Sequence, residues 1–171
     1  MHHSATSTPA RHAASPFARL VATLDYPLYI VTTALGNERS GCLIGFATQC
    51  SIHPPRFLAC ISKKNHTFQL VRQASLVAVH VIDQRNKDIA ELFGGDTGDE
   101  VDKFERVRWH EVDGVPVLDD CERWFAGSVL ERIDLGDHLG LLVSPVEVES
   151  TAASEQLTFQ DARGIKPGHK P

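Results

Sequence analysis

Apolar residues in this chain fall mainly in short runs bounded by turn-forming residues, a pattern typical of β-strands. Residues 41–51 carry no charge, and we expect a single strand there that is buried on both faces. Pro54 and Pro55 cannot donate to a sheet ladder, so this strand should end near Ile52 and a second strand should follow at residues 57–61. The same pattern predicts further strands at residues 28–35, 76–82, 107–111, 123–133, 138–150 and 156–159.

Signals for helices are few and short. Ser15 is placed to cap a helix that begins at Pro16, and Gly94-Gly95 should end a later one. The predicted helical segments are residues 16–24, 67–74, 88–93 and a single turn at 102–106, with turns or loops at 36–40 and 96–101. Many short strands in antiparallel order favour a β-barrel. The sequence contains no GxGxxG motif, which disfavours a Rossmann dinucleotide fold.

The composition agrees with one folded unit. The chain has 171 residues, 42% of them hydrophobic, and a net charge of −5. We expect a disordered tail at residues 1–15, one domain at 16–150, and a C-terminal strand or arm with a flexible tail at 151–171. Lys and Arg form no basic run, so we do not expect nucleic-acid binding. No apolar run approaches the roughly 20 residues that cross a bilayer, and the N-terminal segment is polar, which favours a cytoplasmic protein.

The cysteines and most histidines carry no predicted chemistry. Cys42, Cys50, Cys60 and Cys121 lack CxxC spacing, and we interpret them as buried free thiols. His80 lies inside an apolar strand and is predicted to be a core histidine with satisfied hydrogen bonds. No metal site is proposed.

Six polar residues follow directly after the second predicted strand: Ser62, Lys63, Lys64, Asn65, His66 and Thr67. They concentrate hydroxyl, amide and ammonium donors where a helix beginning near Thr67 would offer backbone N–H groups. This combination predicts a phosphate site. On the residues alone, a solvated helix start with exposed lysines fits equally well.

In their order along the chain, these pieces resemble the flavin reductase-like family of FMN-binding split barrels. That family has a glycine-led strand of small and hydroxyl residues, a Pro-Pro corner, and a second strand ending in a Ser/Lys/Ser/Thr-type cluster. The matching pieces here are residues 41–51, Pro54-Pro55 and the cluster from Ser62 to Thr67. Later matches are residues 77–82 and 89–95, Asp102-Lys103-Phe104, residues 115–118 and Gly136-Asp137-His138, so the resemblance covers roughly residues 17–148.

The resemblance implies a mainly β fold, an antiparallel split barrel of Greek-key type with a few short helices, and a flavin site within it. The ring of FMN, or of FAD, would be lined by Gly45, Phe46, Ala47, Thr48 and Gln49, with Ser51 on the same strand. The ribityl phosphate would be held by Ser62, Lys63, Lys64, Asn65 and Thr67. Lys103 of the Asp-Lys-Phe match would close over the site, and a surface lysine beside a core phenylalanine is the slightly favoured alternative. Leu43, Gly45 and His53 depart from the polar or acidic residues common in relatives, which leaves the choice of flavin open.

The function implied is that of an NAD(P)H-dependent flavin reductase, in which hydride passes from NADH or NADPH to flavin and the electrons go on to an acceptor. His138 would lie where the nicotinamide approaches, and a structural turn histidine is the alternative. The resemblance also implies a homodimer, with a monooxygenase as a possible partner. Two alternatives stay open: a deazaflavin (F420) or haem-binding split barrel, and a flavin carrier or sensor without turnover.

Overall fold

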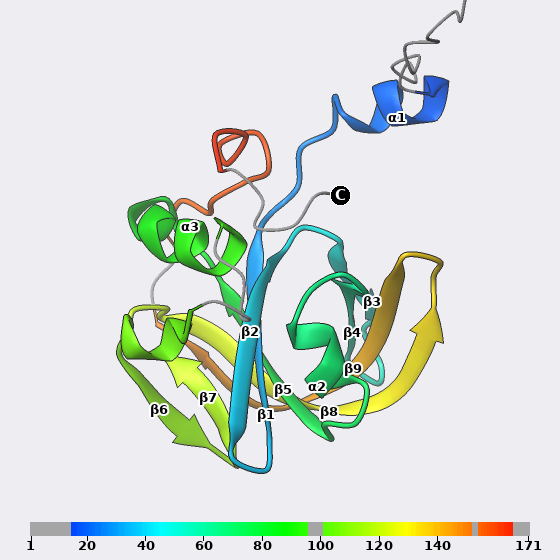
Figure 1. The fold of residues 1–171 in the computed structure, drawn as a ribbon. Helices are drawn as coiled ribbons and strands as arrows, with labels where there is room; N and C mark the ends of the chain where they lie inside the picture. The colour runs from blue at the N-terminus through cyan, green and yellow to red at the C-terminus, as the bar shows by residue number, and fades with distance from the viewer. Residues whose placement is uncertain (1–14, 96–100, 152–153, 166–171) are drawn as a thin grey trace, which may run out of the picture.

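A computed structural model describes residues 15–95, 101–151 and 154–165 of the chain. In these residues a seven-stranded antiparallel sheet has the order β2-β1-β5-β8-β9-β4-β3, and a separate hairpin pairs β6 with β7 (Figure 1). The strands are β1 (Tyr29–Leu35), β2 (Glu38–Ile44), β3 (Ala47–Ser51), β4 (Arg56–Ser62), β5 (Leu76–Val81), β6 (Trp109–Val112), β7 (Val115–Leu118), β8 (Arg123–Asp134) and β9 (His138–Ser150). The predicted fold class, a mainly antiparallel β-barrel with few helices, is confirmed.

The first hairpin shows how the local sequence sets the register. β1 pairs with β2 from Tyr29 opposite Ile44 to Leu35 opposite Glu38. Gly36 adopts φ +60, which a two-residue turn requires and a glycine tolerates. The turn is therefore shorter than the predicted 36–40 segment, and β2 begins at the charged residue Glu38.

The prediction of one strand over residues 41–51 is wrong. β2 ends at Ile44, and β3 begins at Ala47 and pairs with β4 at the opposite edge of the sheet. The chain crosses between the two edges at Gly45, where a Cβ would lie 2.5 Å from a ring carbon of Tyr26. Three of the five residues of β3 are exposed, so the expected burial on both faces does not hold for this half of the segment.

One short helix covers the opening between the two edges of the sheet. Helix α2 (Thr67–Val71) packs against β1, β2 and β4, and Figure 1 shows it between the two halves of the curved sheet. The backbone N–H of Cys60 on β4 donates to the carbonyl oxygen of Phe46, which joins the crossing segment to β4. A core cluster that includes Val31, Ile61 and Val71 fills the space beneath α2.

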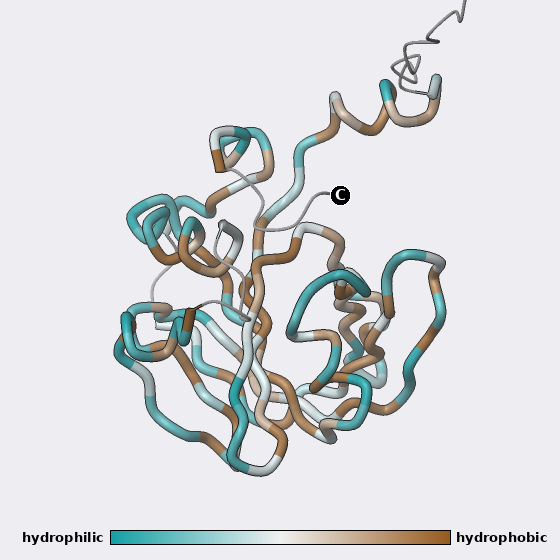
Figure 2. The backbone as a smooth tube through the Cα atoms, viewed as in Figure 1, coloured by the Kyte–Doolittle hydropathy of each residue, from teal (hydrophilic) through white to brown (hydrophobic). Residues whose placement is uncertain are grey.

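A second core lies on the other face of β1 and β2. Helix α3 (Lys87–Gly95) follows the 3₁₀ turn η1 (Gln84–Asn86) and buries Ile89, Ala90 and Phe93 there. Figure 2 shows its hydrophobic residues on the side facing the strands and its hydrophilic residues outside. The turn η2 (Lys103–Glu105) packs against β2 nearby. The predicted 88–93 helix and 102–106 turn are confirmed, while the predicted loop at 96–101 lies largely outside the described residues.

The two ends of the described chain lie against each other. Helix α1 (Pro16–Val21) begins as predicted, with the Ser15 hydroxyl accepting from the Ala18 N–H at 3.1 Å. Residues 156–159 form no regular strand. They make isolated bridges from Gln156 to Asp83 and from Thr158 to Pro27, together with backbone hydrogen bonds at Leu157 and Phe159. Of the tail predicted at residues 1–15, residues 1–14 lie outside the described residues, and Ser15 is the N-cap of α1.

A strand and two cysteines also differ from the sequence prediction. Residues 115–118 were identified only as a match to the family, without an assigned element. In the structure they form β7, whose four residues are all buried. Cys42 and Cys121 are buried as expected, but Cys50 is exposed because it lies on the edge strand β3, and Cys60 is half-buried. Among the described residues, no helix is both long enough and apolar enough to span a membrane.

Candidate functional site

A cavity of about 420 Å³ opens where β2 ends, beside the first residues of β9 and the segment between β4 and α2. Gly45 and Phe46 form part of its wall at the crossing between the sheet edges. Residues 159–165 of the C-terminal segment close another side. Six segments of the described chain, separated in sequence, therefore meet around this cavity.

One wall of this first cavity is aromatic and apolar. The rings of Tyr26 and Phe159 stack with centroids 4.8 Å apart, and Phe46 lies 6.0 Å from Tyr26 in a tilted arrangement. A backbone hydrogen bond joins the two residues whose rings stack, since the Phe159 N–H donates to the Tyr26 carbonyl oxygen at 2.9 Å. Burial raises the pKa of Tyr26, with a smaller contribution from the charge of Asp25. Leu43 and Ile165 extend the apolar surface.

Another part of the lining is polar and comes from the predicted phosphate cluster. Ser62, Lys64 and Asn65 all line the cavity. The Ser62 hydroxyl accepts from the Lys64 N–H at 3.3 Å, and the Asn65 side-chain oxygen accepts from the Thr67 N–H at 3.1 Å. These bonds fold the segment into a compact turn that presents hydroxyl, ammonium and amide groups together.

His138 stands beside this polar edge, because β4 pairs with β9 and brings it opposite Ser62. Its Nδ1 lies 2.7 Å from a carboxylate oxygen of Asp137, and its ring centroid lies 5.2 Å from that of Phe46. The hydrogen bond from His138 lowers the pKa of the Asp137 carboxyl, and the charge of His138 acts in the same direction. The turn before it needs Gly136, whose φ is +99.

Six of the predicted site residues therefore line one cavity: Gly45, Phe46, Ser62, Lys64, Asn65 and His138. Their predicted roles are not tested by this placement, but their proximity was not apparent in the sequence.

The other predicted residues lie elsewhere. Ala47 packs against the core beneath α2, and Thr48, Gln49 and Ser51 lie along β3 outside the cavity lining. The Thr48 hydroxyl donates to the Gln49 carbonyl, and the Gln49 amide donates to the Ser51 carbonyl. These contacts are local, so the predicted contacts of this strand with a flavin ring stay predictions.

Lys63, Thr67 and Lys103 have structural partners. The Lys63 ammonium donates to Asp134 at 2.7 Å, which lowers the pKa of that carboxyl. Thr67 is fully buried and its hydroxyl lies 2.9 Å from that of Ser40. Lys103 is 5% exposed, and its ammonium lies 3.1 Å from the Phe93 carbonyl oxygen. Their predicted contacts with a cofactor also stay predictions.

Reasoning from the sequence missed the aromatic wall. Tyr26 precedes the first predicted strand, and Phe159, Ala162 and Ile165 belong to a segment interpreted as an arm and flexible tail. The one available signal was the alternation of polar and apolar residues at 156–159, where Leu157 and Phe159 indicate contact with the body of the protein.

The cavity fits a flavin on its own features. A flavin needs a flat apolar slot for its ring and donors for its phosphate. The Tyr26–Phe159 stack and Phe46 supply the first, and Ser62 with Lys64 supplies the second. Gly45 allows the Tyr26 ring to lie directly against the crossing segment, since a Cβ there would be 2.5 Å from a carbon of that ring.

Comparison with known proteins identifies one matching family model and several similar proteins. The sequence model of the flavin reductase like domain matches residues 21–167. A probable flavin reductase of Rhizobium meliloti (strain 1021) is 30% identical over 114 residues, which are 64% of this chain and 36% of that protein. The FMN reductase (NADH) RutF of Agrobacterium fabrum is 26% identical over 148 residues, covering 86% of this chain and 84% of the relative.

Two further matches complete the comparison. The reductase component of a flavin-dependent trigonelline monooxygenase from Acinetobacter baylyi is 25% identical over 134 residues, covering 75% of this chain and 42% of that protein. The chain thus spans less than half the length of this relative and of the Rhizobium protein. The solved structure of the Streptomyces globisporus C-1027 NADH:FAD oxidoreductase SgcE6 has a TM-score of 0.76 at 22% identity, covering 86% of this chain and 91% of that one.

Proposed function

The chain belongs to the flavin reductase like domain family, and on that premise we propose that it is a flavin-dependent oxidoreductase using NADH or NADPH. When bound, the flavin supplies the redox chemistry, taking hydride from the nicotinamide and passing the electrons to an acceptor. The observation that carries the proposal is one cavity lined both by an aromatic wall and by donor-rich residues, in which six predicted residues meet.

Each side of the cavity has a distinct role in this proposal. Ser62, Lys64 and Asn65 bind the phosphate end of the flavin, and the apolar wall with Phe46 holds the ring and excludes water. His138, with Asp137 on its Nδ1, orients the nicotinamide against the ring. No acid–base residue is required, since the residues only position the reactants.

We also propose a homodimer. β3 is an edge strand of the seven-stranded sheet, and Ile52, Val146 and Val148 are 70%, 60% and 66% exposed in the single chain. A contiguous patch of exposed apolar side chains is a feature of surfaces that associate. An obligate interface of this kind buries more than about 2,000 Å² in total. A dimeric mass by light scattering at micromolar concentration is expected, and a monomeric mass would contradict the proposal.

The electron acceptor proposed is the flavin of a separate monooxygenase component. The match to the reductase component of a trigonelline monooxygenase supports it.

The test of the proposed function is a flavin titration with a matched pair of variants. Lys64→Ala removes an ammonium from the cavity edge, and Lys87→Ala removes the same charge from the start of α3, outside this cavity. Loss of a charge-assisted contact should weaken FMN binding about tenfold or more in the first variant and leave it unchanged in the second. Wild-type protein that binds no flavin, or that binds it without oxidising NADH or NADPH, would contradict the proposal.

A further inference from the structure

The two adjacent lysines between β4 and α2 point to different surroundings. Lys64 lines the first cavity. Lys63 does not line it, and its ammonium donates to the Asp134 carboxylate at 2.7 Å. Asp134 is the last residue of β8, so the Lys63 side chain reaches the turn between β8 and β9. This turn leads directly to His138, the first residue of β9.

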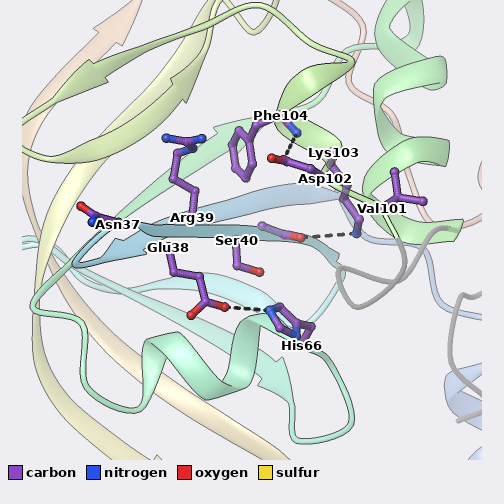
Figure 3. Close-up of a pocket in the computed structure, with 10 residues that line it drawn as sticks. Asn37, Glu38, Arg39, Ser40, His66, Val101, Asp102, Lys103 and Phe104 are labelled. Atoms are coloured by element: carbon purple, nitrogen blue, oxygen red, sulfur yellow. Dashed lines mark hydrogen bonds and ion pairs between the residues drawn. The ribbon is translucent and has the colours of Figure 1, made fainter.

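Side-chain pairs tie the segment between β4 and α2 to the body of the protein at both of its ends. At the α2 end, the His66 Nε2 lies 3.1 Å from the Glu38 carboxylate of β2, in the wall of a second cavity of about 480 Å³. Figure 3 shows these two side chains directed toward each other. At the β4 end, Lys63 pairs with Asp134. The second pair therefore joins the segment to the β8–β9 turn, and the first joins it to β2.

Lys63 holds the β8–β9 turn at two points. Its backbone N–H donates to the Asp137 carbonyl oxygen at 2.9 Å, one position beyond the last pair of the β4–β9 ladder. Its ammonium donates to a carboxylate oxygen of Asp134 that also accepts from the Gly136 N–H at 3.0 Å. The hydrogen bond from Lys63 lowers the pKa of the Asp134 carboxyl, with smaller contributions from the Gly136 N–H and the Lys63 charge.

Packing contributes little to the position of this turn. Gly136 has φ +99, and no heavy atom of the described residues, apart from its chain neighbours, lies within 4 Å of where its Cβ would be. The Asp137 side chain is 87% exposed, so its direction follows the backbone of the turn. The same carboxylate accepts from the His138 Nδ1 at 2.7 Å. A displacement of the turn therefore moves the group that orients the imidazole.

We propose that Lys63 is a positioning residue for His138 and not a ligand of the flavin phosphate. Acting through Asp134, it fixes the β8–β9 turn. The turn places the Asp137 carboxylate on the His138 Nδ1 and leaves Nε2 for the nicotinamide. The inference rests on the function proposed above and deepens it, because it identifies what supports the residue that orients the nicotinamide.

The experiment neutralises one charge at a time. Lys63→Met keeps an aliphatic side chain and removes the ammonium, and Asp134→Asn removes the charge of its partner. Glu38→Gln is the matched control, since it makes the same carboxylate-to-amide change at the other end of the segment, away from the β8–β9 turn. Lys64→Met is the comparison for a lysine that lines the cavity.

The first readout needs no flavin. The ring nitrogens of His138 are followed by NMR in the flavin-free protein, and their resonances are assigned with His138→Ala. Lys63→Met and Asp134→Asn should both shift these resonances, because the hydrogen bond from Nδ1 to Asp137 changes. Glu38→Gln should leave them in place. Unmoved His138 resonances in Lys63→Met and Asp134→Asn would overturn the inference.

The second readout separates positioning from phosphate binding. Lys63→Met should keep FMN affinity within about twofold and slow the reduction of bound FMN by NADH or NADPH about three- to tenfold, since a small misplacement of an orienting group costs rate. Lys64→Met should instead weaken FMN binding about tenfold. In the His138→Ala background, Lys63→Met should slow reduction no further, because both changes remove the same interaction. An exposed ion pair contributes little to stability, so the melting temperature of Lys63→Met should stay close to that of wild type.

If Lys63→Met weakened FMN binding as Lys64→Met does, or still slowed reduction in the His138→Ala background, the inference would be overturned and the proposed function would stand. A wild-type protein that binds no flavin would overturn both.

Discussion

His80 gives a prediction about stability that follows from its surroundings. The side chain is fully buried, its Nδ1 lies 3.0 Å from the Ile30 carbonyl oxygen, and its Nε2 accepts from the Leu118 N–H at 3.1 Å. The imidazole therefore carries its proton on Nδ1 and is neutral. Burial lowers the pKa of His80 from 6.5 to about 4, against a smaller opposing effect of the Ile30 hydrogen bond. The sequence prediction of a satisfied core histidine is confirmed.

The pH dependence follows from the sign of this difference. Between pH 6.5 and about 4 the unfolded chain holds a proton on His80 that the folded protein does not, so stability falls as the pH falls through this window. At about 1.4 kcal/mol per pH unit, the loss attributable to His80 is about 3 kcal/mol, complete near pH 4 and absent above pH 7.

The assay is urea unfolding at several pH values on wild type, His80→Gln and the control His110→Gln. His110 is half-exposed and pairs with Asp119 at the surface. His80→Gln is expected to be less stable at pH 7, because two buried hydrogen bonds are perturbed, and to lose about 3 kcal/mol less than wild type on going to pH 4. His110→Gln should keep most of the wild-type pH dependence, because the charge of His110 is the smallest of the contributions to the pKa of His80. If the free energies of unfolding of wild type and His80→Gln changed in parallel with pH, the assignment of a lowered pKa to His80 would be refuted.

Three further outcomes are expected. His138→Ala should leave flavin affinity nearly unchanged and slow reduction of bound flavin by NADH about ten- to a hundredfold, in stopped-flow measurements; an unchanged rate with a lower melting temperature would mark a structural turn histidine. Thr67→Val removes the hydroxyl bonded to Ser40 and should lower the free energy of unfolding by about 1–3 kcal/mol in urea titrations, and an unaltered value would contradict the buried hydrogen bond. A thiol reagent should label exposed Cys50 in the native state and spare buried Cys42, whose pKa burial raises to about 11; equal labelling of both would contradict the fold.

The sequence identified most strands because their apolar runs end at clear turn signals. It failed at Gly45, where small uncharged residues continue without a break although the chain passes from one sheet edge to the other. The placement of β2 and β3 at opposite edges of the sheet depends on how the whole sheet curves, which no local pattern encodes.

The polar half of the site was predictable, and the apolar half was not. Ser62, Lys64 and Asn65 are close in the sequence, so their composition alone marks them. Tyr26 and Phe159 are 133 positions apart by number and form one wall only through tertiary contacts. Thr67 was predicted to hold the phosphate because of its residue type and position. In the structure its side chain faces the interior, and its hydroxyl pairs with that of Ser40.

The most direct test of the central claim is anaerobic mixing of the flavin-loaded protein with NADH or NADPH while the visible absorbance of the flavin is recorded. The account predicts that the absorbance bleaches within the turnover time and that oxidised nicotinamide forms in equimolar amount. A protein that retains its flavin while neither NADH nor NADPH bleaches it would contradict the assignment of this cavity as the site of hydride transfer.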